Sequence, residues 1–285
     1  MLRKLFLKAY QLEQKLFGRL GLGRLPLAQK AKRFLFERIQ PKTAECYGLT
    51  LYLDAVYGFD PRTYKPQVAA LLKREVHEGD VVVDVGANIG LFTCLMARAA
   101  GRKGQVYAFE PEPRNLEFLK KNLAVNHIEN VIIVPKALAD KAGSFPLVSR
   151  GAHSTFGFDF FNSKRDFITV ETIRLDDFFK GKKEKIALIK MDIIGADLKA
   201  LRGMRAVVRR DKPKFVLGFC PAYLEKSGHK PREYLEELHA LGYPIYELAG
   251  GKTQEVSPLE FDAFVTRYSP KVGIAQGELF CVPWR

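Results

Sequence analysis

The sequence predicts an α/β protein whose core is a mostly parallel, doubly wound sheet. Short β-branched runs alternate with helix-like stretches through most of the chain, from the run that begins at Val81 onward. This alternation is typical of strand–helix–strand units, which place parallel strands side by side. A length of 285 residues and a hydrophobic content of 47% allow one large domain, or one domain with a small appendage.

Residues 1–45 are expected to form a basic, amphipathic helical extension, and residues 46–285 the domain itself. Apolar side chains recur at three- and four-residue spacing in the first part of the extension. Residues 1–40 carry ten Lys and Arg but only two Glu, so they hold +8 of the net charge of +14. This charge implies an acidic partner, such as phospholipid headgroups, phosphorylated glycans or nucleic acid. Two interpretations stay open: residues 1–24 dock on an anionic membrane surface, or the helices pack on the domain or on a second subunit.

In the domain, strands are expected where β-branched and aromatic residues cluster, and helices where apolar residues recur with the helical period. The expected strands cover residues 81–85, 105–109, 131–135, 186–192, 214–219, 243–247 and 278–283. The expected helices cover residues 67–76, 91–100, 113–126, 197–210 and 231–241. The last strand follows a loop-rich segment, which is compatible with an antiparallel insertion into the sheet.

Composition excludes several classes of protein. No uninterrupted apolar run reaches the roughly 18 residues that a transmembrane helix needs. The N-terminus lacks a continuous apolar region and a small-residue cleavage site, so it makes a poor signal peptide. The four cysteines are scattered without a Cys-x-x-Cys pair, which argues against structural zinc and against a disulfide framework. A cytoplasmic location is therefore expected, with a peripheral position at the inner membrane face as the alternative.

A glycine turn between the first of these strands and the helix after it carries the strongest functional signal. Asp84 stands near the end of the strand, and Gly86, Asn88 and Gly90 follow before the helix begins. Such a turn presents backbone N–H groups and a helix N-terminus to a nucleotide-like ligand. Glu110 closes the next apolar run and could accept hydrogen bonds from both ribose hydroxyls. The sequence therefore predicts an adenosine-containing cofactor, against the alternative of a tight turn that binds no ligand.

Asn88 distinguishes between two kinds of cofactor. Dinucleotide-binding folds usually place a second glycine at this position, where it admits a pyrophosphate. An asparagine makes NAD a poorer fit, and it suits an adenosine ligand that carries no phosphate, such as S-adenosylmethionine.

The segment from Asp84 to Gly90 resembles motif I of class I S-adenosylmethionine-dependent methyltransferases. The wider pattern is similar to the FkbM family within that class, over about residues 65–245, with further support from residues 108–111, 170–178 and 189–192. The resemblance implies a Rossmann-like, seven-stranded fold and, most often, methyl transfer to a hydroxyl oxygen of a sugar or polyketide product. It implies cofactor contacts, including Ala137 against the adenine face, from Asp84, Gly86, Ala87, Asn88, Gly90, Glu110 and Ala137.

The sequence departs from the family pattern at two positions near the expected substrate pocket. The family usually carries a glutamate before the glycine in the segment that here reads Asp192-Ile193-Ile194-Gly195, so Ile194 replaces an acid. The family also tends to carry a glutamate in the next strand, where this chain has Gly218. Either the acceptor differs from that of the family, or catalysis is impaired.

Asp192 and His153 are the catalytic candidates. Asp192 lies at the end of the fourth strand, where doubly wound folds place their ligand crevice, and could contact the acceptor or the cofactor amine. The alternative is a structural aspartate that caps the next turn. His153 lies in a polar connection and could act as a base near neutral pH, although an ordinary loop histidine is the alternative. No metal site is expected, because the strand end at residues 218–221 adds no carboxylate or amide to Asp192.

The expected function is O-methylation of a hydroxyl on a glycan or other small natural product. A nucleic-acid methyltransferase is the second hypothesis, disfavoured because no Asn/Asp-Pro-Pro-aromatic motif follows the fourth strand. The basic extension also lacks interleaved aromatic residues for base stacking. The third hypothesis is a catalytically impaired, cofactor-binding or membrane-docked scaffold, which Ile194 and Gly218 motivate.

Overall fold

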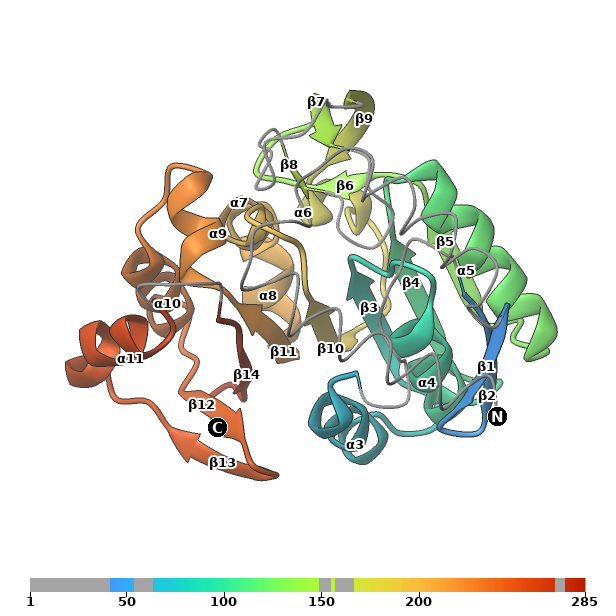
Figure 1. The fold of residues 1–285 in the computed structure, drawn as a ribbon, viewed down its shortest axis with the longest axis horizontal. Helices are drawn as coiled ribbons and strands as arrows, with labels where there is room; N and C mark the ends of the chain where they lie inside the picture. Colours follow the sequence, from blue (N-terminus) through green and yellow to red (C-terminus); the bar gives the residue numbers. More distant parts are fainter. Residues whose placement is uncertain (1–41, 54–63, 149–154, 157–166, 270–274, 285) are drawn as a thin grey trace, which may run out of the picture.

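The computed structural model describes residues 42–53, 64–148, 155–156, 167–269 and 275–284. Within these ranges the chain forms a main sheet, a smaller second sheet and a two-stranded hairpin (Figure 1). Most of the expected helical extension, residues 1–41, lies outside the described part of the chain.

The main sheet has eight strands in the order β13-β12-β14-β11-β10-β3-β4-β5. Its five parallel strands are β11 (Lys214–Phe219), β10 (Ile186–Met191), β3 (Val81–Val85), β4 (Gln105–Phe109) and β5 (Val131–Val134). The antiparallel part consists of β12 (Ile245–Ala249), β13 (Lys252–Glu255) and β14 (Gly277–Cys281), with β14 between β11 and β12. The predicted α/β fold with a mostly parallel sheet is confirmed. The sheet exceeds the expected seven strands because a Gly250-Gly251 turn, with positive φ at both residues, adds β13 as a hairpin.

Helices cover both faces of this sheet, so two hydrophobic cores form. Val82 packs into one core and Val83 into the other, because neighbouring side chains of a strand point to opposite faces. The first core includes α3 (Pro66–Glu75), α4 (Leu91–Ala100) and α5 (Pro113–Val125). The second includes α6 (Leu175–Phe178), α7 (Asp197–Arg202), α8 (Arg205–Asp211), α9 (Pro221–Lys226), α10 (Pro231–Ala240) and α11 (Phe261–Arg267), the last preceded by the 3-10 turn η3 (Pro258–Glu260).

A four-stranded second sheet is inserted between β5 and β10, and the sequence patterns did not predict it. Its order is β6-β9-β7-β8, with bounds β6 (Ala137–Leu138), β9 (Phe167–Ile173), β7 (Gly143–Val148) and β8 (Thr155–Phe156). In Figure 1 this sheet lies above the carboxyl ends of β3 and β4. Ala137, Leu138 and Leu147 line a pocket together with Val85 and Phe109, the last residues of β3 and β4. The insertion therefore forms one wall of the site.

The single helix expected at residues 197–210 is wrong, because α7 and α8 replace it. Gly203 separates the two helices, and a Cβ there would lie 1.9 Å from the backbone oxygen of Ala139. The Gly203 carbonyl also accepts a hydrogen bond from the Asp176 backbone N–H (3.0 Å). The helix is interrupted here because Gly203 lies directly against the backbone at the start of the second sheet.

An N-terminal hairpin of β1 (Thr43–Cys46) and β2 (Leu49–Tyr52) packs against α5. The side chain of Asn122 accepts a hydrogen bond from the Tyr52 backbone N–H (2.6 Å), and that of Asn126 accepts one from Thr50 (3.0 Å). Strand β1 spans the expected boundary between residues 45 and 46.

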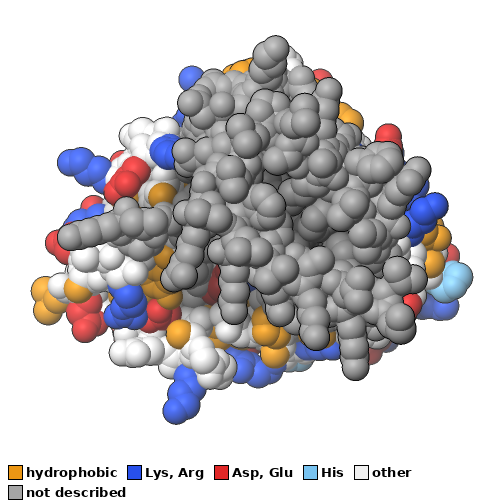
Figure 2. Space-filling model, in the orientation of Figure 1, with side chains coloured by type: hydrophobic (Ala, Val, Ile, Leu, Met, Phe, Trp, Pro, Cys, Tyr) orange, Lys and Arg blue, Asp and Glu red, His pale blue; other side chains and the backbone are white. Residues whose placement is uncertain are grey.

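Among the described residues, no helix is both long and apolar enough to span a membrane. Basic and acidic side chains are interspersed along the coloured rim of the face in Figure 2.

Candidate functional site

The glycine turn between β3 and α4 packs directly against the end of β10. Gly86 has φ +79°, and a Cβ there would lie 2.6 Å from the backbone oxygen of Asp192. Gly90 has φ +92° and is the N-cap of α4, where a Cβ would lie 2.5 Å from Leu119 Cδ1. Asn88 has φ +54°, a left-handed conformation that asparagine adopts more readily than most side chains. Conformation and the backbone of Asp192 both require glycine at position 86, and the positive φ favours glycine at position 90.

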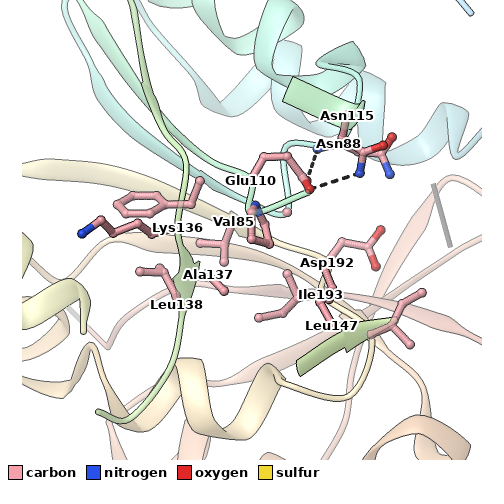
Figure 3. A pocket seen from close by; sticks show the side chains of 14 residues that line it. Val85, Asn88, Glu110, Asn115, Lys136, Ala137, Leu138, Leu147, Asp192 and Ile193 are labelled. Atoms are coloured by element: carbon pink, nitrogen blue, oxygen red, sulfur yellow. Dashed lines mark hydrogen bonds between the residues drawn. The ribbon is translucent and has the colours of Figure 1, made fainter. Parts of the chain in front are cut away.

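Glu110, directly after β4, ties this turn to the start of α5. Its Oε2 accepts a hydrogen bond from the Asn88 backbone N–H (2.8 Å). Its Oε1 accepts hydrogen bonds from the Glu112 backbone N–H (3.0 Å) and from Asn115 Nδ2 (3.1 Å). Figure 3 draws the hydrogen bonds to Asn88 and Asn115 as dashed lines. Burial raises the pKa of Glu110 to about 7, although these hydrogen bonds lower it. A carboxylate offers about four acceptor positions, so Glu110 retains capacity for a ligand donor.

Asp84 lies beneath the turn and forms a buried ion pair with a lysine that sequence reasoning missed. Lys190 Nζ is 3.1 Å from Asp84 Oδ1, and it donates a hydrogen bond to the Gly86 carbonyl (3.2 Å). Asp84 Oδ2 accepts a hydrogen bond from Thr93 Oγ1 (2.6 Å). Asp84 is completely buried, so it supports the turn through Lys190 and Thr93. The sequence does place one charged residue in each of two otherwise apolar strands, Asp84 in β3 and Lys190 in β10. These two positions pair in register in the sheet.

A pocket of about 560 Å³ opens beside Glu110, and we call it the Glu110 pocket. Its apolar wall includes Ala137 and Leu138 from β6 and Ile193 from the end of β10 (Figure 3). The full lining is Val85, Gly86, Asn88, Phe109, Glu110, Pro111, Asn115, Lys136, Ala137, Leu138, Leu147, Asp192, Ile193 and Ile194. An apolar wall opposite a buried carboxylate suits the flat base and the polar ribose of an adenosine ligand.

A second pocket of about 970 Å³ lies on the other side of the glycine turn, and we call it the Tyr64 pocket. Its lining is Tyr64, Lys65, Gly86, Ala87, Asn88, Ile89, Leu91, Phe92, Lys190, Asp192, Ile194, Tyr223 and Gln276. Four residues line both pockets, namely Gly86, Asn88, Asp192 and Ile194. The two pockets therefore meet at the glycine turn and at Asp192.

Asp192 is held by two side chains from distant parts of the chain. Its Oδ2 is 2.6 Å from Lys65 Nζ, and its Oδ1 accepts a hydrogen bond from Gln276 Nε2 (3.0 Å). Lys65 Nζ is also 2.6 Å from Glu278 Oε1. Burial raises the pKa of Asp192, but the ammonium groups of Lys65 and Lys190 outweigh that effect and leave the pKa below its usual value. Asp192 is therefore ionised at neutral pH.

The other groups of this cluster are strongly coupled to Asp192. Burial lowers the pKa of Lys65, but the negative charges of Asp192 and Glu278 raise it above its usual value. Burial raises the pKa of Glu278 to about 7, with Lys65 acting in the opposite direction. Asp197, at the start of α7, has a pKa raised to about 8, first by burial and then by the charge of Asp192. Sequence reasoning missed Lys65 and Glu278, although Glu278 was visible as a single acid in an apolar strand.

The structure brings together most of the residues that the sequence singled out. Gly86, Asn88, Glu110, Ala137 and Asp192 line the Glu110 pocket, and Ala87 lines the Tyr64 pocket. Asp84 and Gly90 line neither pocket. Asp84 supports the turn through Lys190 and Thr93, and Gly90 ends the turn as the N-cap of α4. His153 lies outside the described residues, so its candidate role as a base stays a prediction.

In the described part of the chain, no group of three or more His, Cys, Asp and Glu side chains lies close enough together to hold a metal ion. The four cysteines are all buried, and none of them forms a disulfide.

A glycine turn after a central parallel strand, an acid at the end of the next strand and an apolar wall beyond it define a class I S-adenosylmethionine-dependent methyltransferase. Comparison with known families agrees with this geometry. The profile of the methyltransferase FkbM domain matches residues 84–245, which is more than half of the chain. The protein belongs to the FkbM methyltransferase family, whose cofactor is S-adenosylmethionine.

Individual relatives match parts of the chain. Hexuronic acid methyltransferase AglP of Haloferax volcanii is 31% identical over 143 residues, 48% of this chain and 55% of that protein. Methyltransferase sdnD of Sordaria araneosa is 30% identical over 190 residues, 52% of this chain and 72% of that protein. A crystal structure of an FkbM methyltransferase from Methylobacillus flagellatus is 18% identical, with a TM-score of 0.44, covering 73% of this chain and 44% of that chain. This chain thus spans about half the length of the first of these relatives.

Proposed function

We propose that this methyltransferase transfers the methyl group of S-adenosylmethionine to a hydroxyl oxygen of a sugar or of another small natural product. The observation that carries the proposal is the position of Asp192. An ionised carboxylate lies where the two pockets meet, held by Lys65 and Gln276. This is where a base is needed if the donor occupies one pocket and the acceptor the other.

The Glu110 pocket is the proposed site for the adenosine part of the donor. Glu110 would accept a hydrogen bond from a ribose hydroxyl, and Ala137 would lie against the adenine face. The backbone of the glycine turn at Gly86 and Asn88, which line both pockets, would approach the remainder of the donor closely. The donor supplies an electrophilic methyl group next to Asp192.

The Tyr64 pocket is the proposed acceptor site. Tyr64, Phe92 and Tyr223 give it aromatic walls, and Lys65, Asp192 and Gln276 provide polar groups. Pockets that combine apolar walls with a few convergent polar groups bind small polar ligands and fix their orientation. Similarity to a hexuronic acid methyltransferase adds support for a sugar acceptor.

The proposed reaction needs little more than alignment and a base. The acceptor oxygen attacks the methyl carbon, the C–O bond forms as the C–S bond breaks, and the sulfonium becomes a thioether. Asp192 accepts the hydroxyl proton as the oxygen loses it, and releases that proton to water afterwards. Holding the two reactants in line contributes much of the acceleration, and a positioned base typically contributes about 10²–10⁴-fold.

The test measures binding and turnover separately. Isothermal titration calorimetry with S-adenosylhomocysteine reports on the donor site. Production of S-adenosylhomocysteine from S-adenosylmethionine is then followed with a panel of neutral and acidic sugars, and with RNA in parallel. The Asp192→Asn variant is expected to lose about 100-fold or more in kcat, the range of a lost general base, with little change in donor affinity.

Each other outcome contradicts a part of the proposal. Donor binding without turnover on any hydroxylated compound would favour a scaffold. Turnover on RNA alone would favour the nucleic-acid hypothesis. Full turnover by Asp192→Asn would remove Asp192 from the reaction.

A further inference from the structure

Strand β11 lacks the acid that the family usually carries, but the strand beside it has an acid at the paired position. Gly218 on β11 is paired in register with Glu278 on β14, which runs antiparallel to it. Glu278 is 7% exposed, and its Oε1 is 2.6 Å from Lys65 Nζ. We propose that Glu278 supplies the carboxylate that position 218 lacks, and that the Glu278–Lys65 pair positions Asp192 for the methyl transfer. This inference rests on the proposed function, in which Asp192 accepts the acceptor's proton.

The space at Gly218 explains why the acid comes from the neighbouring strand. A Cβ at Gly218 would lie 2.6 Å from Asp192 Oδ1 and 2.8 Å from Gln276 Nε2. Both distances are shorter than carbon and polar atoms tolerate. Any side chain at position 218 would therefore displace Asp192 or break its bond to Gln276. The glycine allows Asp192 to lie against the strand, and β14 brings a carboxylate to the same cluster.

Lys65 is well placed to transmit the effect of Glu278. Its ammonium group is 2.6 Å from a carboxylate oxygen of Asp192 and 2.6 Å from one of Glu278, and its side chain is 13% exposed. Lys65 has a left-handed φ of +45° at the N-cap of α3, directly before Pro66. Non-glycine residues rarely adopt this conformation, so the surrounding contacts must offset its strain. Lys65 is thus fixed from both sides, by the backbone and by two carboxylates.

Sharing one ammonium between two carboxylates limits how far the basicity of Asp192 is lowered. If Lys65 paired with Asp192 alone, the full positive charge would lower the basicity of that carboxylate further. The negative charge of Glu278 offsets part of the positive charge of Lys65, and the ion pair keeps the ammonium at a fixed place beside the Tyr64 pocket. Among the described residues, those that interact electrostatically with Glu278 include Lys65, Asp192, Lys190, Tyr64 and Tyr268.

The test compares Glu278→Gln with Glu278→Asp and with a matched control. Asp211→Asn is the control, because Asp211 is also buried and ion-paired, with Arg210, but binds the Ile186 backbone at the opposite end of β10. Glu278→Gln is expected to lower kcat about tenfold, with the acid limb of the pH–rate profile shifted to lower pH, because Asp192 becomes a weaker base. Donor affinity should not change, and Glu278→Asp should recover part of the rate. Asp211→Asn should lose stability without moving the pH profile.

A second measurement does not depend on knowing the acceptor. Magnetic resonance of lysine side chains labelled with the heavy nitrogen isotope detects ammonium groups that exchange their protons slowly. Lys65 should give such a signal in the native protein, assigned by its loss in Lys65→Met, and Glu278→Gln should abolish it.

The outcomes separate the two proposals. If the native protein methylates no hydroxylated compound, the proposed function fails, while the Lys65 signal still decides whether Glu278 anchors the lysine. A signal that persists in Glu278→Gln overturns the inference. So does a Glu278→Gln variant with native kcat and pH profile, or one that loses kcat only in proportion to its stability and donor affinity.

Discussion

Glu110 offers the sharpest test of the donor site, through the substitution Glu110→Gln. The carboxylate accepts hydrogen bonds on both oxygens, from Asn88 on one side and from Glu112 and Asn115 on the other. An amide has only one acceptor atom, so its NH₂ group must face one of these donors. In the proposed complex its single oxygen must serve both the protein N–H groups and the ribose hydroxyl. Hydrogen bonds to a charged group contribute about 1.5–3 kcal/mol each, so the loss of one weakens donor binding by about 10- to 150-fold.

The pH dependence of donor binding gives a second, independent test of the role of Glu110. Burial raises the pKa of Glu110 to about 7 in the free protein. In the ionised form both oxygens are acceptors, and protonation turns one of them into a donor that faces N–H groups. Donor affinity should therefore fall as the pH drops below about 7, by up to tenfold for each pH unit. In Glu110→Gln this dependence should disappear.

Calorimetric titration with S-adenosylhomocysteine at about pH 6 and about pH 8 measures both effects. Glu112→Gln is the matched control, since Glu112 is equally buried and caps α5 by accepting from the Asn115 N–H (2.7 Å), but does not line the pocket. The control should lose stability and keep its affinity. Native affinity in Glu110→Gln, or a pH dependence that survives the substitution, would refute the assignment of Glu110 to the ribose.

Three further predictions concern the frame of the site. Asp84→Asn leaves the Lys190 ammonium, 4% exposed, without its counter-ion and should lower the free energy of unfolding by about 3–5 kcal/mol, measured by urea denaturation; a change near zero would contradict the ion pair. Gly90→Ala should cost about 1–3 kcal/mol and weaken donor binding, because φ is +92° and the Cβ would lie 2.5 Å from Leu119; an unchanged melting temperature would contradict this. The pKa of Asp197 is raised to about 8, so the folded state binds the proton more tightly than the unfolded state. Its contribution to stability should therefore fall as the pH rises from about 4 to about 8, and Asp197→Asn should flatten that part of the thermal melting profile.

The parallel core of the fold was predictable because its strands are buried on both faces. Strands such as Val81–Val85 and Lys214–Phe219 are mostly apolar runs bounded by turns, and the structure reproduces their predicted limits. The break at Gly203 was not predictable, since it depends on the carbonyl of Ala139, which lies far away in the sequence. The second sheet was also missed, because its strands β6 and β8 have only two residues each and carry no periodic pattern.

The candidate site likewise has residues that the sequence predicted and residues that it did not. The glycine turn and Glu110 are local features of one strand–turn–helix–strand unit, so a single sequence was enough to bring them together. The contact between Lys65 and Asp192 depends on how α3 lies beside the sheet, and no local pattern encodes that position. Lys190 and Asp84 were predictable in principle, because each is a charge in an apolar strand, but their pairing required the register of β3 and β10.

The position of Asp192 follows from the order of the strands. From β3 the chain proceeds outward through β4 and β5 on one side, and from β10 through β11 on the other. The carboxyl ends of β3 and β10 therefore flank the point where the winding reverses, which is where doubly wound folds bind their ligands. Beyond β11 lies an antiparallel strand, so the residue opposite Gly218 belongs to a segment near the C-terminus. An acid on that strand reaches the same cluster as an acid on β11 would. The glycine at position 218 is thus no argument for lost activity, because the fold offers a second strand from which the carboxylate can come.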